Sequence, residues 1–200
     1  MDILFATSNK NKVAEANQVS RKYGITFSHI HVLYPEIRSD SVAEVAKSGA
    51  QHVYDEIKRP LVVEDSGLFI KALNDFPGAY SHFVFDKIGN KGILKLMEGV
   101  EDREARFVSA VAYYEKNERK NMFMDVDYSK PVIFEGVVEG KITLEERGSK
   151  GFGYDPIFRP KGYVKTFAED PKTKSEASHR RIAFEKLCEW LTSKPGEQRR

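Results

Sequence analysis

The order of its strand and helix patterns is what most constrains the fold of this 200-residue sequence. In the first half, short apolar runs typical of buried strands alternate with stretches whose apolar residues recur at helical spacing. In the second half, three strand patterns follow one another at residues 103–114, 122–128 and 132–144. Alternation predicts parallel strands covered by helices, and consecutive strands predict an antiparallel extension. We therefore expect an α/β fold with one mixed sheet.

Local signals place the boundaries of several elements. Ser41 and Glu44 form a capping-box pattern at the start of a strongly amphipathic stretch, which predicts a helix to Ile57. Gly24 stands where a left-handed residue would end an earlier helix. The remaining expected elements are strands at 3–6, within 25–33, at 60–63 and at 68–73, a turn at 76–78, a helix over 81–97 that breaks near Gly89, a glycine-rich loop at 148–153 and a helix at 178–191.

Composition narrows the functional classes. Lys and Arg number 32 against 30 Asp and Glu, so the formal net charge of +2 lacks the basic excess of a dedicated nucleic-acid binder. Cys188 is the sole cysteine, which excludes an internal disulfide framework. The N-terminus lacks a signal-peptide pattern, and no run approaches the ~20 apolar residues of a membrane span. We expect a cytoplasmic protein without a membrane partner, with one domain over 1–193 and a polar tail at 194–200.

A polar segment separates the first strand from the first helix. Backbone N–H groups at a helix N-terminus attract anions, whereas lysines there oppose the helix dipole unless an anion is bound. The segment is not a Walker A loop, because the glycine pattern is missing. It predicts either a phosphate site or a solvated, capped helix start. Its residues are Thr7, Ser8, Asn9, Lys10, Asn11 and Lys12.

Two adjacent carboxylates, Glu64 and Asp65, end an apolar run. Their charges repel unless a cation lies beside them, and Mg²⁺ prefers such oxygen ligands. The open alternative is an acidic turn in which Asp65 or Ser66 caps the next element. Glu36, just after Pro35, is a further candidate ligand, although a lone glutamate in this context is usually a surface residue.

An aromatic residue flanked by glycines and a basic pair form the last candidates. Phe152, between Gly151 and Gly153, can stack on a base, although an aromatic in a tight turn more often belongs to the core. His179 and Arg180 lie in the first turn of the last expected helix, where the alternative is two exposed basic residues. Together with the carboxylates and lysines, these features indicate a nucleotide-handling α/β enzyme with Mg²⁺.

The same segments resemble those of the inosine triphosphate pyrophosphatase family, also called the Ham1-like or RdgB-like family. They occur in family order between residues 7 and 180, and the strings at 64–68 and 151–158 are the most specific. The matching strings are TSNKNK at 7–12, PE at 35–36, EDSGL at 64–68, FPGAYS at 76–81, GFGYDPIF at 151–158 and SHR at 178–180.

The resemblance implies an elongated mixed β-sheet flanked by helices, with two lobes and a nucleotide cleft between them. It implies Mg²⁺-dependent hydrolysis of ITP, dITP and XTP to the monophosphate and pyrophosphate by a homodimer. It assigns the phosphates to residues 7–12, the metal to Glu36, Glu64 and Asp65, and the general base to Asp65. The residues implied in the other substrate contacts are Ser66, Phe152, Gly153, Tyr154, Asp155, Lys174, His179 and Arg180.

Alternatives from other classes stay open at this point. A Maf-like pyrophosphatase for other modified nucleotides would share the chemistry but differ in substrate preference. A nucleotide-binding module without catalysis would bind ITP and release no product, yet it gains nothing from three carboxylates without a metal. A nucleic-acid-binding role is disfavoured by the balanced charge.

Overall fold

The computed structural model describes residues 1–115 and 130–193. The strand expected at 122–128 and the tail expected at 194–200 lie outside these residues. In the described part, a seven-stranded mixed sheet has the order β2-β1-β3-β5-β6-β7, with β4 paired to β3. β1 is parallel to β2 and β3, and the other pairs are antiparallel, which confirms the expected mixed sheet.

The elements follow one another in the expected alternation, with additions after residue 150. The three-residue segments η1 (Arg21–Tyr23), η2 (Lys71–Leu73) and η3 (Asp155–Ile157) are 3₁₀ turns. The strands and helices are β1 (Asp2–Ala6), α1 (Lys10–Ser20), β2 (Thr26–Ile30), α2 (Val42–Ile57), β3 (Leu61–Ile70), β4 (Pro77–Gly78), α3 (Ser81–Leu96), β5 (Glu104–Tyr114), β6 (Val132–Ile142), β7 (Phe158–Pro160), α4 (Pro171–Ala177) and α5 (His179–Ser193).

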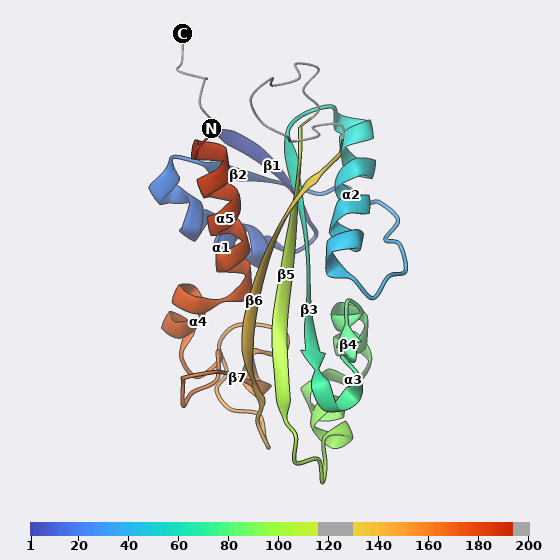
Figure 1. The fold of residues 1–200 in the computed structure, drawn as a ribbon, viewed down its shortest axis with the longest axis vertical. Coiled ribbons are helices and arrows are strands. Elements are labelled where there is room, and N and C mark those ends of the chain that lie inside the picture. The colour runs from blue at the N-terminus through green and yellow to red at the C-terminus, as the bar shows by residue number, and fades with distance from the viewer. Residues whose placement is uncertain (116–129, 194–200) are drawn as a thin grey trace.

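Helices cover both faces of the sheet along an elongated molecule (Figure 1). α1 and α5 lie on one face and bury an apolar cluster that includes Phe5, Phe27 and Phe184. α2 covers the opposite face over a second cluster, and a third cluster fills the other end, where α3 packs. The expected division into two lobes with a cleft stays a prediction.

One expectation about β3 was wrong. Two separate strands were expected at 60–63 and 68–73, with an acidic turn between them as one alternative, but β3 is one ten-residue strand with Glu64 and Asp65 at its middle. The reason is long-range, because β5 pairs with every residue of β3 from Leu61 to Ile70. A continuous partner strand therefore overrides the local polar interruption.

Local capping and kink signals were largely confirmed. The Oγ of Ser41 accepts from the backbone N–H of Glu44, whose carboxylate accepts from Ser39 rather than closing the box on Ser41. Gly24 has φ 67°, although it closes the 3₁₀ turn η1 that follows α1. α3 bends at Gly89, where φ is 59°. The sequence patterns did not predict α4 and β7, which are short.

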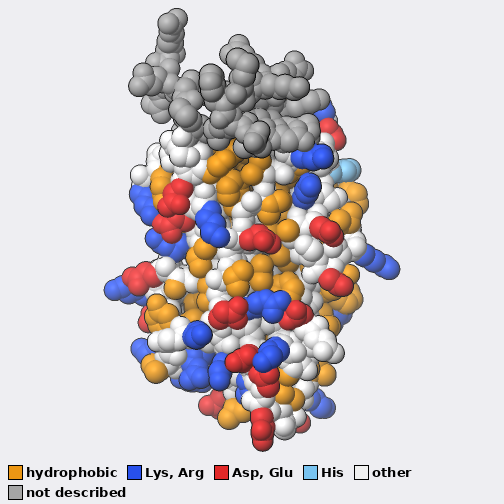
Figure 2. Space-filling model, viewed as in Figure 1, with side chains coloured by type: hydrophobic (Ala, Val, Ile, Leu, Met, Phe, Trp, Pro, Cys, Tyr) orange, Lys and Arg blue, Asp and Glu red, His pale blue; other side chains and the backbone are white. Residues whose placement is uncertain are grey.

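The surface shows no broad area of one charge on the face drawn in Figure 2, where basic, acidic and apolar side chains alternate. This agrees with the balanced composition. None of the described helices combines the length and apolarity needed to cross a bilayer.

Candidate active site

The candidate site lies where the edge of β3 changes partner strands. β1 pairs with β3 at residues 61–63, and β4 pairs with it at Leu68 and Phe69. Among the described strands, none pairs with this edge over residues 64–67. In open α/β sheets, ligands bind beyond the carboxyl ends of strands at such divergences. The segment that leaves β1 and enters α1 faces this open edge, because Lys12 donates to the backbone oxygen of Glu64 at 3.2 Å.

The start of α1 is a capped helix end without acidic residues in its first turn. The side chain of Asn9 accepts from the N–H of Asn11 at 2.9 Å, and the Oγ1 of Thr7 accepts from the N–H of Asn9 at 3.1 Å. Ser8, Lys10 and Asn11 are exposed around this end. The helix N-terminus offers free N–H groups, and the exposed Lys10 adds a positive charge there. Both features make this helix end a suitable place for a phosphate group.

Strand alternation separates the two carboxylates that are adjacent in sequence. Successive residues of a strand point to opposite faces, so Glu64 faces α5 and Asp65 faces α2. Glu64 is 4% exposed and accepts from Ser109 at 2.6 Å. Burial alone would raise the pKa of Glu64, but the charges of Arg180 and Lys12 hold it well below its usual value. Glu64 is thus an internal counter-ion for both cations.

Asp65 has a different environment on the α2 side. Its Oδ2 atom is buried and has no hydrogen-bond partner among the described residues. Burial raises the pKa of Asp65 to about 7, Lys12 opposes the rise, and the negative charges of Glu64 and Glu36 add to it. A buried oxygen without a partner is rare in folded proteins and marks a place where a ligand, ion or water completes the structure.

A chain of charges on the α5 side joins three helices. Arg180, which is 1% exposed, donates from Nη1 to Glu15 at 2.6 Å and from Nη2 to Ser66 at 3.0 Å. Glu15 also pairs with the Nζ of Lys174 at 2.9 Å. Lys174 in turn pairs with Asp155 at 2.7 Å. One buried electrostatic network therefore joins residues from α1, β3, η3, α4 and α5.

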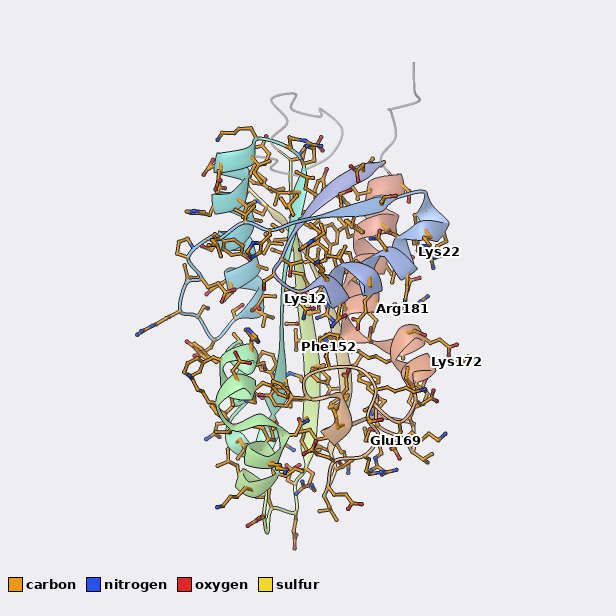
Figure 3. All side chains as sticks on the ribbon, turned by 180° about the vertical axis from the view of Figure 1, so that it is seen from behind. Lys12, Lys22, Phe152, Glu169, Lys172 and Arg181 are labelled. Carbon is orange, nitrogen blue, oxygen red and sulfur yellow. The ribbon has the colours of Figure 1, made fainter. Side chains whose placement is uncertain are left out.

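Phe152 lies over this network. The Nζ of Lys174 lies 3.9 Å from the centroid of the Phe152 ring. The loop that carries the ring is held by Asp155, whose Oδ2 accepts from the N–H of Phe152 at 2.8 Å. Gly151 has φ 80°, and a Cβ there would lie 2.2 Å from that oxygen, so the loop requires glycine. In Figure 3, Lys12 and Phe152 both lie near the middle of the molecule, with Phe152 just below Lys12 in this view.

His179 is a buried, neutral imidazole beside Arg180. Burial lowers its pKa well below the usual value, and the positive charge of Arg180 lowers it further. Its ring stacks on Phe107 at 4.7 Å between centroids, and its Nδ1 has no hydrogen-bond partner among the described residues. The basic pair is therefore buried, and the alternative of two exposed basic residues was wrong.

Comparison with known proteins identifies the family. The sequence profile of the Ham1 family matches residues 3–190. The chain belongs to the Ham1 family. It is 49% identical to the dITP/XTP pyrophosphatase of Methanopyrus kandleri, over 95% of this chain and 96% of that protein. It is 46% identical to the dITP/XTP pyrophosphatase of Methanosarcina acetivorans, over 96% of this chain and 98% of that protein.

Solved structures of Ham1 proteins share the fold. A Ham1 protein from Coxiella burnetii superposes with a TM-score of 0.78 at 33% identity, covering 97% of this chain and all of that one (100%). A dITP/XTP pyrophosphatase from Mycobacterium abscessus superposes with a TM-score of 0.70 at 30% identity, covering 96% of this chain and 100% of that one.

Most of the residues expected in the site lie close to one another in the structure. Glu36, Tyr154 and Gly153 are the three whose surroundings need separate comment. Glu36 is exposed, and among the described residues no group of three or more acidic, His or Cys side chains is placed to hold a metal ion. Tyr154 is 4% exposed and donates to the backbone of Ser81, so it anchors its loop to α3. Gly153, with φ 61°, allows the turn of that loop.

Three residues in or beside the candidate site were not singled out from the sequence: Glu15, Ser109 and Tyr34, which packs against Gly49 of α2. Glu15 follows Lys12 by three residues, so helical spacing placed the two on one side of α1 and was the available signal. Ser109 reaches Glu64 only through the pairing of β5 with β3, where it lies opposite Ser66. No local pattern indicates that contact.

Replacing Glu15 with glutamine is expected to lower stability in a pH-dependent way. Burial alone would raise the pKa of Glu15, but Arg180 and Lys174 lower it below its usual 4.5. A carboxylate whose pKa is lowered in the folded state stabilises the fold above the unfolded pKa and loses that contribution as pH falls. We expect Glu15→Gln to cost about 1.5–3 kcal/mol at pH 7, the range for hydrogen bonds to charged groups.

Urea titrations between pH 7 and pH 3 measure this difference. The gap between the wild type and Glu15→Gln should narrow as pH falls below about 4.5. The matched control is Glu176→Gln on α4. The carboxylate of Glu176 is exposed, and its Oε1 lies 3.9 Å from the Nζ of the exposed Lys172. Such surface pairs contribute little, so this variant should match the wild type. A constant gap at all pH values would contradict the assignment.

Gly136→Ala is expected to displace the start of α5. Gly136 lies on β6, and a Cβ there would lie 2.0 Å from the backbone oxygen of His179 and 2.7 Å from the backbone nitrogen of Ala183. Backbone cannot yield as a side chain does, so we expect a loss of about 1–3 kcal/mol, typical of overpacking. Substrate affinity should fall too, because His179 and Arg180 move with the helix. Val137→Ala, at a 45% exposed neighbour, is the control for strand tolerance in both measurements.

Proposed function

We propose that this Ham1-family chain hydrolyses the deaminated purine nucleoside triphosphates ITP, dITP and XTP to the monophosphate and pyrophosphate. The observation that carries the proposal is the set of charges along the open edge of β3. Lys12 pairs with Glu64 and acts on the pKa of Asp65, and Arg180 links Glu64 to Glu15, which also pairs with Lys174. The cations suit a triphosphate and the polar edge of a base, and the carboxylate of Asp65 suits water activation. The names of its relatives as dITP/XTP pyrophosphatases support the same substrate class.

The triphosphate binds at the start of α1 in this proposal. The N–H groups and side chains of residues 7–12 surround its oxygens, as anions commonly bind at helix N-termini. Lys12 is the cation nearest to the middle of the site, since its Nζ lies 2.9 Å from the buried carboxylate of Glu64. It stabilises the charge that develops on the departing pyrophosphate.

The base binds next to Phe152, with selectivity arising from its 6-position edge. Inosine and xanthosine present a 6-oxo acceptor, whereas adenosine presents an amino donor. In this proposal Arg180 and Lys174 supply donors that match the first edge and do not match the second, and such a mismatch can discriminate by about 10⁴. Gly153 and Asp155 shape this pocket, and the neutral His179 offers a further hydrogen-bonding group. Rejection of guanosine must rest on its 2-amino group.

The donor set fits a hard divalent cation, which we propose is Mg²⁺. The fit rests on the unpartnered buried Oδ2 of Asp65, since carboxylate oxygens suit Mg²⁺. Asp65 and Glu36 would hold it, and Glu64, already paired with Lys12 and Arg180, would act on its waters. Mg²⁺ characteristically uses one or two carboxylates together with substrate phosphates, so three protein ligands are not needed. When bound, it neutralises phosphate charge and lowers the pKa of its water.

The reaction is a hydrolytic displacement at the α-phosphorus. A bond forms between the water oxygen and the α-phosphorus, and the bridging bond to the β-phosphate breaks with its electrons leaving on pyrophosphate. An oxygen of Asp65 that does not hold the cation takes the proton of the attacking water. Ser66 touches the substrate, and its hydroxyl is held by Arg180.

We further propose that the chain is a cytoplasmic homodimer. Tyr80, Phe83 and Ile88, at and near the start of α3, are 41%, 62% and 41% exposed. Large exposed apolar side chains that recur within one short segment are a feature of surfaces that another protein covers. Sedimentation velocity measures the mass directly, and a monomer at all concentrations would contradict the dimer.

The decisive experiment incubates the purified protein with Mg²⁺ and equal concentrations of ITP, dITP, XTP, GTP and ATP, and separates pyrophosphate from orthophosphate. The expected result is pyrophosphate and monophosphate from the first three, with GTP and ATP nearly untouched. Orthophosphate release, or equal activity on ATP, would contradict the proposal. Preference for other modified nucleotides would favour a Maf-like activity, and binding without product would favour a non-catalytic module.

A further inference from the structure

Tyr34 occupies a notch in α2 that exists because residue 49 is glycine. A Cβ at Gly49 would lie 2.7 Å from the Cε2 and 3.1 Å from the Cζ of Tyr34. It would also lie 3.2 Å from the Cγ1 of Val63 on β3. The Tyr34 ring therefore sits close against the backbone of α2, beside the strand that carries Asp65.

The rest of the segment between β2 and α2 is weakly held. Leu33 and Ile37 are 84% and 44% exposed, and Glu36 is exposed too. Tyr34 and Val32 are half-buried and pack against the α2 cluster, and Tyr34 is the one of the two that is nearer in the chain to Glu36. Pro35 follows it directly and has a fixed φ, which limits the freedom of the next residue, Glu36.

The anchor is on the same side of the sheet as Asp65. Val63 and Asp65 are two residues apart on β3 and so point to the same face. Tyr34 and Val63 both lie close to the same point over Gly49, so the Tyr34 ring is on the face of β3 that carries Asp65. Glu36 follows this anchored side chain by two residues.

We propose that Tyr34, seated over Gly49, is a positioning residue that holds Glu36 beside Asp65 and thereby sets the affinity of the site for a divalent cation. The inference rests on the proposed function, because that function supplies the cation. The ring supplies the anchoring and the hydroxyl does not, since the contact with Gly49 is made by ring carbons. Gly49 is needed as well, because a side chain at this position would displace the Tyr34 ring.

A double-mutant cycle separates this role from ordinary packing. Binding of Mn²⁺ alone, followed by electron paramagnetic resonance of the free ion, is the probe, because Mn²⁺ shares the oxygen preference of Mg²⁺. Tyr34→Ala and Gly49→Ala should each weaken Mn²⁺ binding by roughly 10-fold or more, the effect of losing groups that orient metal ligands. Gly49→Ala made in the Tyr34→Ala background should weaken it no further, because the 2.7 Å clash with the ring is gone and the remaining 3.2 Å contact is with a Val63 methyl group that can shift.

Three controls make the result specific. Tyr34→Phe should bind Mn²⁺ like the wild type, because the ring is kept. Ile37→Ala changes an exposed residue of the same segment and should also leave binding unchanged. Thermal unfolding should show that Gly49→Ala lowers Tm in the wild type but does not in the Tyr34→Ala background, where alanine favours the helix. In ITP turnover, Tyr34→Ala should raise the Mg²⁺ concentration for half-saturation and keep kcat at saturating Mg²⁺.

The outcomes distinguish this inference from the proposed function. A wild type that hydrolyses ITP, with unchanged Mn²⁺ affinity in Tyr34→Ala and Gly49→Ala, would overturn the positioning role alone. Equal loss of affinity in Tyr34→Phe and Tyr34→Ala would also overturn it, since the hydroxyl would then be responsible. A wild type that neither binds Mn²⁺ nor hydrolyses ITP would overturn both.

Discussion

Asp65→Asn is expected to lower the turnover of ITP by about 10²–10⁴-fold, the usual contribution of a general base. Asparagine keeps the size of the side chain but cannot take a proton from water. Steady-state pyrophosphate release at saturating ITP and Mg²⁺ measures the loss. The effect should fall on kcat, because the phosphate contacts of residues 7–12 and the base contacts of Phe152 are left in place.

Stability should move in the opposite direction in this variant. Asp65 carries a buried oxygen without a partner, and burial raises its pKa to about 7. A neutral amide avoids the cost of burying that charge, so unfolding in urea should occur at the same or a higher urea concentration. Asp86→Asn, at an exposed position on α3, is the matched control and should keep full turnover. Near-normal turnover of Asp65→Asn would refute its role as the base.

Arg180→Met is expected to be the most destabilising single change in the site. Arg180 pairs with Glu64 at 3.2 Å and Glu15 at 2.6 Å, and it is 1% exposed. Removing one partner of a buried pair leaves an uncompensated charge and typically costs about 3–5 kcal/mol. Methionine fills similar volume, so the loss reports on charge rather than on a cavity. Urea unfolding at pH 7 measures it.

Combining Arg180→Met with Glu64→Gln tests that explanation. After Arg180→Met the buried Glu64 has lost one of its two cations and keeps Lys12, so removing its charge should let the double variant regain part of the stability that Arg180→Met loses. If the double variant loses the sum of the two single effects, the buried charge of Glu64 is the wrong cause. The same variants test selectivity, since Arg180→Met that still rejects ATP and keeps full ITP turnover would refute its role at the 6-oxo group.

The candidate site shows how far local patterns reach. Helix ends, a glycine-flanked aromatic and a basic pair are set by short segments, so the residues and the resemblance were enough to name TSNKNK and GFGYDPIF as candidate binding segments. The environment of each side chain could not. Glu64 and Asp65 look equivalent in sequence, yet one is paired with two cations and the other has a buried oxygen without a partner.

Local sequence patterns were enough to predict the mixed α/β class, most of the element boundaries and the short segments that are candidates for chemistry, because helical periodicity, capping residues and glycine conformations act within a few residues. The continuity of β3 through its acidic pair depends on tertiary structure, since the pairing that overrides the local signal comes from β5, about forty residues later. The same long-range pairing brings Ser109 to Glu64, and the packing of α1 against α5 brings Glu15 to Arg180. Glu64 and Asp65 have different surroundings because successive residues of β3 point to opposite faces of the sheet. The sequence shows this alternation, but it does not show which neighbours cover each face.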